Sequence, residues 1–233
     1  MKHVIVGYGQ IGKAIHGLFP SADCYDLDSK LMDTSCDFMH VCFPFSDAFK
    51  SEVARYQGIC NPVRTIVYST VPIGTCSDLE VIHSPVEGKH PDLEMSMRFF
   101  ERWIGASDRE AALSAAGLFM EIGIRTRVVN NSNYTEALKL LSTAEYGINI
   151  VFAGYKAKVA KALEMPYELT KDWNREYNKL YRNLGLGNRY QKYVLDEPEG
   201  PIGGHCVVPN AELLANQASD RLLDLIMEYG HDI

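Results

Sequence analysis

The length, composition and charge of the chain exclude several classes of protein. It has 233 residues, 46% hydrophobic and 10% aromatic, which suits one or two domains with buried cores and argues against general disorder. The 23 basic and 30 acidic residues give a net charge of −7, which disfavours a nucleic-acid-binding surface over the whole molecule. No apolar run approaches the roughly 20 residues of a membrane-spanning helix. The six cysteines form no CxxC pair, so we expect a reducing, cytoplasmic setting, no disulfide framework and no metal site.

Short apolar runs alternate with amphipathic stretches through the first part of the chain. Each run has three to six residues, is rich in Val and Ile, and is bounded by Gly, Pro, Asp or Ser. This alternation predicts βαβ units and a doubly wound parallel sheet of the Rossmann type, in an α/β domain covering residues 1–130. The expected strands are His3–Gly7, Ala22–Asp26, Phe38–Phe43, Thr65–Ser69, Glu80–His83, Trp103–Gly105 and Thr126–Val129.

Residues 131–233 read differently and predict a smaller, all-helical domain built on one long helix. The stretch 133–165 lacks Pro and repeats apolar residues at spacings of three, four and seven, which is one face of a helix. Gly147 and Gly154 lie seven residues apart on this helix, so they permit close approach by a helix or ligand, or are simply tolerated. Further helices are expected at Tyr167–Asn183 and Ala211–Tyr229, separated by a glycine-rich irregular stretch.

The N-terminal segment contains a dinucleotide-binding fingerprint. Gly7-Tyr8-Gly9-Gln10-Ile11-Gly12 follows the first expected strand and opens a helical pattern. The first glycine allows a tight turn, the second lets the backbone approach a pyrophosphate, and the third packs the helix onto the sheet. Asp26 lies 19 residues after Gly7, where an acid binds the adenosine ribose and repels a 2′-phosphate. The sequence therefore predicts NAD as the cofactor.

Four further segments resemble one enzyme family. They are Tyr68–Thr75 (YSTVPIGT), Ser84–Gly88 (SPVEG), Glu136–Lys139 at the start of the long helix, and Gly203–Cys206 (GGHC). In this order, after the glycine fingerprint, they are similar to the UDP-glucose/GDP-mannose/UDP-N-acetylmannosamine dehydrogenase family. Arg102-Trp103-Ile104-Gly105 also resembles a strand of that family.

The resemblance implies a set of site residues. Family members oxidise a sugar-nucleotide alcohol to a carboxylate with two NAD per product. By this resemblance Cys206 is the nucleophile, Lys139 stabilises an oxyanion, Thr70 holds water or the nicotinamide end, and Glu87 activates water. Gly203, Gly204 and His205 form the substrate loop, and Thr143 and Asn210 complete the catalytic set. The cofactor-binding residues are Gly7, Gly9, Gln10, Ile11, Gly12, Asp26, Pro44, Ser69 and Thr70.

The match to the family has departures. Val86 follows Pro85 where the family places its Glu, which shifts the assignment of Glu87 by one position. Thr143 stands where the family has Asn, and Asn210 where it has Asp; an amide can orient water but cannot act as a base. The family also has a third domain that binds the substrate's nucleotide, and this chain stops at Ile233.

These departures leave other functions open. One alternative is a catalytically degenerate NAD-binding regulatory or interaction module, and another is a two-electron hydroxy-acid dehydrogenase. The expected substrate is anionic or sugar-derived, and the family implies a homodimer through the long helix 133–165. The stretch 171–193 carries six basic and two acidic residues with interleaved aromatics, which indicates either an anion site or an amphipathic helix with a solvated basic face.

Overall fold

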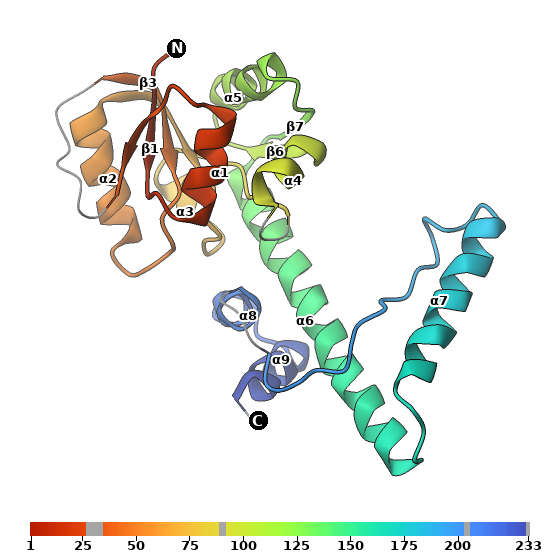
Figure 1. Cartoon of the computed structure of the whole chain (residues 1–233). Helices are drawn as coiled ribbons and strands as arrows, with labels where there is room; N and C mark the ends of the chain where they lie inside the picture. Colours follow the sequence, from red (N-terminus) through yellow and green to blue (C-terminus); the bar gives the residue numbers. More distant parts are fainter. Residues whose placement is uncertain (27–34, 89–91, 203–205, 232–233) are drawn as a thin grey trace. The chain divides into compact units, whose positions relative to one another are not determined.

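The structure is a computed structural model of the chain that describes all residues except 27–34, 89–91, 203–205 and 232–233 (Figure 1). The chain divides into two compact units, Met1–Lys139 and Leu140–Ile233, called here the sheet unit and the helical unit. The sheet unit contains a seven-stranded sheet in the order β2-β1-β3-β4-β5-β6-β7. The strands are β1 His3–Val6, β2 Asp23–Tyr25, β3 Cys36–Val41, β4 Pro62–Val67, β5 Ile82–His83, β6 Arg102–Gly105 and β7 Thr126–Val129.

All seven strands predicted from the apolar runs are confirmed, with one difference in direction. Neighbouring strands pair in parallel except β5 and β6, which meet antiparallel through His83 and Gly105. The predicted doubly wound parallel sheet of the Rossmann type is confirmed, with this antiparallel pair as its exception among the described strands. The sheet-unit helices are α1 Gln10–Leu18, α2 Phe49–Cys60, α3 Thr75–Asp78, α4 Leu93–Phe99 and α5 Arg109–Glu121.

Both faces of the sheet are covered, as the continuous apolar strands require (Figure 1). Side chains alternate along a strand, so β1 contributes Ile5 to one core cluster and Val4 and Val6 to the other. The first cluster includes Ile15 of α1 and Phe119 of α5. This packing holds the carboxyl ends of β1 to β5 at one edge, where ligands bind in doubly wound folds.

A chain of polar side chains crosses the core between β1, β3 and the end of β4. His3 Nδ1 lies 3.0 Å from His40 Nε2, and His40 Nδ1 lies 2.8 Å from the Tyr68 hydroxyl. The imidazole of His40 also stacks with Phe19. Burial lowers the pKa of His40 to about 3, so its ring stays neutral and can alternate donor and acceptor along the chain.

The helical unit is built on α6 (Ser132–Ala162), which begins in the sheet unit, with α7 (Glu168–Asn183), α8 (Val207–Ala215) and α9 (Arg221–His231). The Asn131 side chain accepts from Asn133 N at 2.9 Å at the start of α6. The single final helix expected at Ala211–Tyr229 is wrong: the chain forms two helices there. The first, α8, ends at Ala215, and the side chain of Asp220 accepts from Leu222 N at 2.9 Å, as an N-cap of α9 does.

The two glycines of the long helix are explained by close helix packing. A Cβ on Gly147 would lie 2.7 Å from Val207 Cγ1, and one on Gly154 would collide with the Tyr229 hydroxyl. Glycine therefore lets α8 and α9 approach α6, which selects close approach by a helix over simple tolerance. None of the helices in the described part of the chain is long and apolar enough to cross a membrane.

The buried neutral His40 predicts a stability that falls with acid. The unfolded chain gains the proton below pH 6.5, whereas the folded chain gains it only near pH 3. Between pH 7 and pH 5 the free energy of unfolding should therefore drop by about 2 kcal/mol through this residue. Urea unfolding at the two pH values measures this loss.

The matched comparison is His40→Gln against His16→Gln, a partly buried histidine on α1. The first variant should reduce the loss between pH 7 and pH 5 by about 2 kcal/mol, because buried His83 still contributes, and the second should leave the loss as in the wild type. Equal slopes in both variants would contradict the assignment.

Candidate active site

The glycine loop after β1 has the conformation that the fingerprint predicts. Gly7 has φ of 91°, and a Cβ there would lie 2.7 Å from Phe43 N. A Cβ on Gly12 would lie 2.0 Å from Gly7 O, so only glycine allows this turn to enter α1. Gly9 has open space where its Cβ would be and forms the N-cap of α1. Its backbone is thus free to approach a phosphate at the helix N-terminus.

A cavity of about 390 Å³ opens beside this loop, between the ends of β1 and β3. The strand order reverses at these two strands, which is the point where doubly wound folds bind nucleotides. The cavity brings together four predicted residues, Gly7, Gly9, Asp26 and Pro44, with several that the sequence did not indicate. The added lining residues are Val6, Cys42, Phe43, Ser46, Glu52 and Tyr56. A lining that combines aromatic rings with the Asp26 carboxylate suits an adenosine, so the residues present fit a dinucleotide.

Other predicted cofactor residues lie at the same edge of the sheet. Ser69 is buried after β4, and its hydroxyl donates to Phe43 O at 2.5 Å, which ties the ends of β3 and β4 together. Thr70 follows and is half-buried. Gln10 and Ile11 begin α1; Gln10 is exposed, and Ile11 packs against the core.

The start of α6 is anchored to this edge by a buried carboxylate. Glu136 is fully buried and accepts from Gly74 N at 2.7 Å and from Cys76 N at 2.8 Å. Burial raises the pKa of Glu136, while these hydrogen bonds oppose the shift. The carboxylate therefore caps the turn that follows Thr70 and fixes that turn against the helix.

His83 makes a second connection at this edge. Its Nδ1 lies 2.8 Å from Thr135 Oγ1, and its Nε2 lies 3.2 Å from Ser69 O. Burial lowers the pKa of His83 to about 3, so the ring is neutral at physiological pH. Ser69 and Thr70 are thereby held beside the first turn of α6.

The segment after β5 carries the predicted lysine and glutamate contacts. Lys139 donates to Val86 O at 2.9 Å, which places its ammonium at the peptide before the exposed Glu87. Buried Arg102 donates to Ser84 O at 2.7 Å and to Ser84 Oγ at 2.9 Å. The structure thus brings Thr70, Glu87 and Lys139 to one edge of the sheet unit.

The remaining predicted residues belong to the helical unit. Cys206 is exposed at the N-terminus of α8. Asn210 is buried one turn later and its Nδ2 lies 3.4 Å from Thr143 Oγ1 of α6. The two departures from the family pattern are therefore neighbours that form one polar contact. Gly203, Gly204 and His205 lie outside the described residues.

Sequence reasoning missed the residues that support the site. His83, Arg102 and Tyr56 were not assigned roles, although His83 ends an expected strand and Ser84 directly follows it. A position at the carboxyl end of a strand was the available signal, because ligands bind at that edge in doubly wound folds. Among the residues that the structure describes, no group of three or more His, Cys, Asp or Glu side chains could hold a metal ion.

Comparisons with known proteins place this geometry among dehydrogenases. No protein-family model and no curated protein matches the chain in sequence. In structure it is similar to a UDP-D-ManNAc dehydrogenase from Pyrococcus horikoshii, with a TM-score of 0.78 and 16% identity over 99% of this chain and 68% of that one. The chain has the fold of the nucleotide-sugar dehydrogenases. This confirms the fold that the sequence motifs indicated.

Two other solved structures are also similar to the chain in fold. The UDP-N-acetyl-mannosamine dehydrogenase from Staphylococcus aureus gives a TM-score of 0.72 at 15% identity, covering 99% of this chain and 67% of that one. The 3-hydroxyisobutyrate dehydrogenase from Mycobacterium tuberculosis gives 0.67 at 11% identity, covering 98% and 92%. The fold is thus shared with nucleotide-sugar dehydrogenases and with a 3-hydroxyisobutyrate dehydrogenase.

The Glu136 contacts predict a specific loss of stability. In Glu136→Gln the amide retains one acceptor oxygen and turns its NH₂ toward a backbone N–H, which leaves a buried donor unpaired. The free energy of unfolding should fall by about 2 kcal/mol, measured by urea unfolding. Glu110→Gln, at an exposed position on α5, is the control and should change it by less than about 0.5 kcal/mol. Equal losses in the two variants would contradict the anchoring role.

Proposed function

We propose that the protein is an NAD-dependent oxidoreductase that acts on an alcohol in a sugar-derived or other anionic substrate. The observation that supports this most is the cavity at the reversal of strand order, which joins the glycine loop to Asp26. When bound there, NAD supplies the hydride acceptor. Gly7, Gly9 and the start of α1 would hold the pyrophosphate, and Asp26 would bind the adenosine ribose.

The chemistry of the sheet-unit residues fits alcohol oxidation. The Lys139 ammonium is held at the Val86 carbonyl, where it can stabilise negative charge on a substrate oxygen. Glu87, next in the chain, is exposed and free to receive or position a proton through water. His83 stays neutral and buried, so its role is to position Ser69 and Thr70 rather than to exchange protons with substrate.

Within this proposal, Cys206 makes the oxidation proceed to an acid. Its thiolate would add to the aldehyde carbon, the resulting thiohemiacetal would lose a hydride to a second NAD, and water would release the acid from the thioester. Support comes from the exposure of Cys206 and from its place in the Gly203–Cys206 motif. The nucleotide-sugar dehydrogenase resemblance favours this route.

A two-electron oxidation is the second candidate. Asn210 and Thr143 contact each other where the family pattern has Asp and Asn, so no carboxylate stands one turn after Cys206. The likeness to 3-hydroxyisobutyrate dehydrogenase, over 92% of that chain, favours this alternative. A third possibility is an NAD-binding module without turnover.

We further propose a cytoplasmic homodimer formed through α6. Leu141, Phe152 and Tyr155 are each more than half exposed on this helix, although they belong to the apolar pattern that predicted it. We propose that a second copy of the chain covers this face, since several exposed apolar side chains on one helix favour a protein partner.

Two substitutions distinguish the candidate reactions. Cys206→Ser and Lys139→Met are assayed for NADH formation and acid release with UDP-sugars and with 3-hydroxy acids, and Lys161→Met on the same helix is the control. The four-electron reaction predicts a loss of about 100-fold or more in both variants. The two-electron reaction predicts that only Lys139→Met loses activity. Unchanged turnover in both variants would contradict both mechanisms.

Cofactor choice is tested at Asp26. Removing its charge should weaken NAD binding by about tenfold and reduce the preference over NADP, because a carboxylate that binds the ribose is lost. Calorimetric titration of Asp26→Asn with each cofactor measures this change. Asp23→Asn, an exposed acid on β2, should bind as the wild type does. An unaltered NAD affinity in Asp26→Asn would refute the ribose contact, and no NAD binding by the wild type would refute the proposed cofactor.

A further inference from the structure

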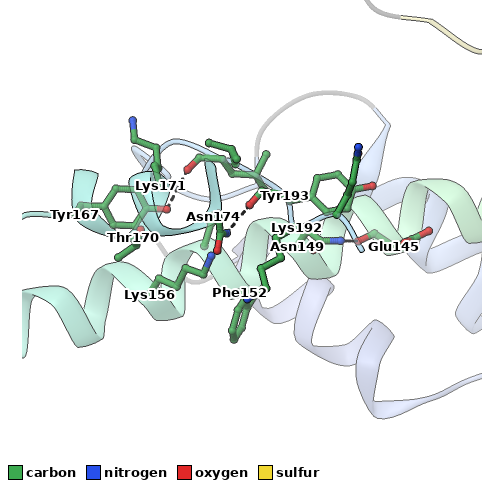
Figure 2. Close-up of a pocket in the computed structure, with 14 residues that line it drawn as sticks. Glu145, Asn149, Phe152, Lys156, Tyr167, Thr170, Lys171, Asn174, Lys192 and Tyr193 are labelled. Carbon is green, nitrogen blue, oxygen red and sulfur yellow. Dashed lines mark hydrogen bonds between the residues drawn. The ribbon is translucent and has the colours of Figure 1, made fainter. Parts of the chain in front are cut away.

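A second cavity lies wholly within the helical unit. It shares no lining residue with the cavity assigned to the cofactor. It has a volume of about 390 Å³ and is lined by α6, α7 and the segment 191–195 (Figure 2). This size falls within the range of small-molecule sites in proteins. The cavity includes part of the basic and aromatic stretch 171–193, which the proposed dehydrogenase function leaves unused.

The wall made by residues 191–195 is held in place by side chains of α7 and the residue before it. Asn178 donates to Lys192 O and accepts from Lys192 N, each at 2.8 Å. Buried Asn174 donates to Tyr193 O at 2.7 Å, and the Tyr167 hydroxyl donates to Leu195 O at 3.2 Å. These side-chain contacts fix an irregular segment against a helix, so the cavity is formed before any ligand enters.

Two lysines at this cavity lack an anionic partner. In the part of the chain that the structure describes, neither Lys156 nor Lys192 forms an ion pair, whereas Lys171 pairs with Glu168 and Asp196. The Lys192 ammonium rests on the ring of Tyr177, 3.8 Å from its centroid. Burial lowers the pKa of Lys156, and repulsion from Lys192 lowers it further. A dianion between the two ammonium groups would relieve this repulsion.

The one carboxylate that lines the cavity stands at a distance from Lys156. Glu145 and Lys156 are both on α6, eleven residues apart, which is about 16 Å along the helix axis. Figure 2 shows them toward opposite ends of the cavity, with Asn149 and Phe152 between them. The end near Lys156 therefore combines positive charge with the Asn174 amide and aromatic groups, and it is suited to an anion.

We propose that this cavity is a binding site for a small phosphorylated molecule, with its phosphate between Lys156 and Lys192. Lysine ammonium groups bind phosphate oxygens through charge-assisted hydrogen bonds. The remaining volume, bounded by Tyr167 and Phe152, would receive the organic part of the ligand. The site is independent of the proposed oxidoreductase chemistry, so each proposal can fail alone.

The test uses inorganic pyrophosphate as the probe and lysine acetylation as a position-specific readout. Peptide mapping of the full chain should show that pyrophosphate protects Lys156 and Lys192 severalfold, while Lys161 and Lys179 react equally with and without it. This readout separates the cavity from any binding at the glycine loop. Equal acetylation of Lys156 in both conditions would overturn the proposal, as would a Lys156 that is already inaccessible without pyrophosphate.

Titration calorimetry with matched variants gives the second arm of the test. Lys156→Gln should weaken pyrophosphate binding by about tenfold or more, and Lys156→Arg should restore it to within about threefold of the wild type. Lys161→Gln removes the same charge from an exposed position of the same helix and should change the affinity less than about twofold. An equal loss in Lys161→Gln would mean nonspecific charge attraction and would refute the site.

Discussion

The buried carboxylate of Glu136 is the contact on which the arrangement of the sheet unit depends. It accepts two backbone N–H groups of the turn after β4, and it lies in the first turn and a half of α6. A buried charge is stable only when such donors surround it, so the turn and the helix fix each other. Thr135 and Lys139 on the same helix then contact His83 and the Val86 carbonyl. One charged anchor thus sets the positions of Thr70, Lys139 and the segment leading to Glu87.

The core supports this anchor with polar side chains rather than with ion pairs. His40 links His3 to Tyr68, and buried Arg102 holds Ser84 while lying over the ring of Tyr68. Most of the described ion pairs instead join solvent-exposed side chains, such as Lys50 with Asp78, where screening makes each worth little. The geometry at the carboxyl edge of the sheet therefore rests on directional hydrogen bonds in a low-dielectric interior. Such contacts tolerate little displacement, so they fix the positions of the residues at this edge.

The helical unit contains two of the residues that depart from the resemblance. Asn210 and Thr143 meet through a polar contact at positions where the nucleotide-sugar dehydrogenase pattern has Asp and Asn. This contact joins α6 and α8 without a carboxylate. The same likeness in fold extends to a 3-hydroxyisobutyrate dehydrogenase. Fold alone cannot choose between the two chemistries, because the choice lies in a few side chains.

Local sequence pattern was sufficient to predict the strands, the long helix and the glycine loop. Burial restricts the strand and helix positions to apolar residues, and the tight turn restricts Gly7 and Gly12 to glycine. Local pattern failed where the outcome depends on distant segments. The antiparallel pairing of β5 with β6 follows from how the chain packs, and no periodicity encodes it. The break before α9 was missed for another reason, because its signal is the local cap at Asp220 and not an apolar period. The roles of His83 and Arg102 could likewise not be predicted, since the sequence around a histidine or arginine in an apolar strand does not show whether its side chain has a buried partner. The cavity beside Lys156 is formed by residues up to 50 positions apart, and only tertiary structure brings them together. The sequence determined which reactive and polar side chains are present. Burial and contacts between distant segments decided which of these side chains have fixed positions.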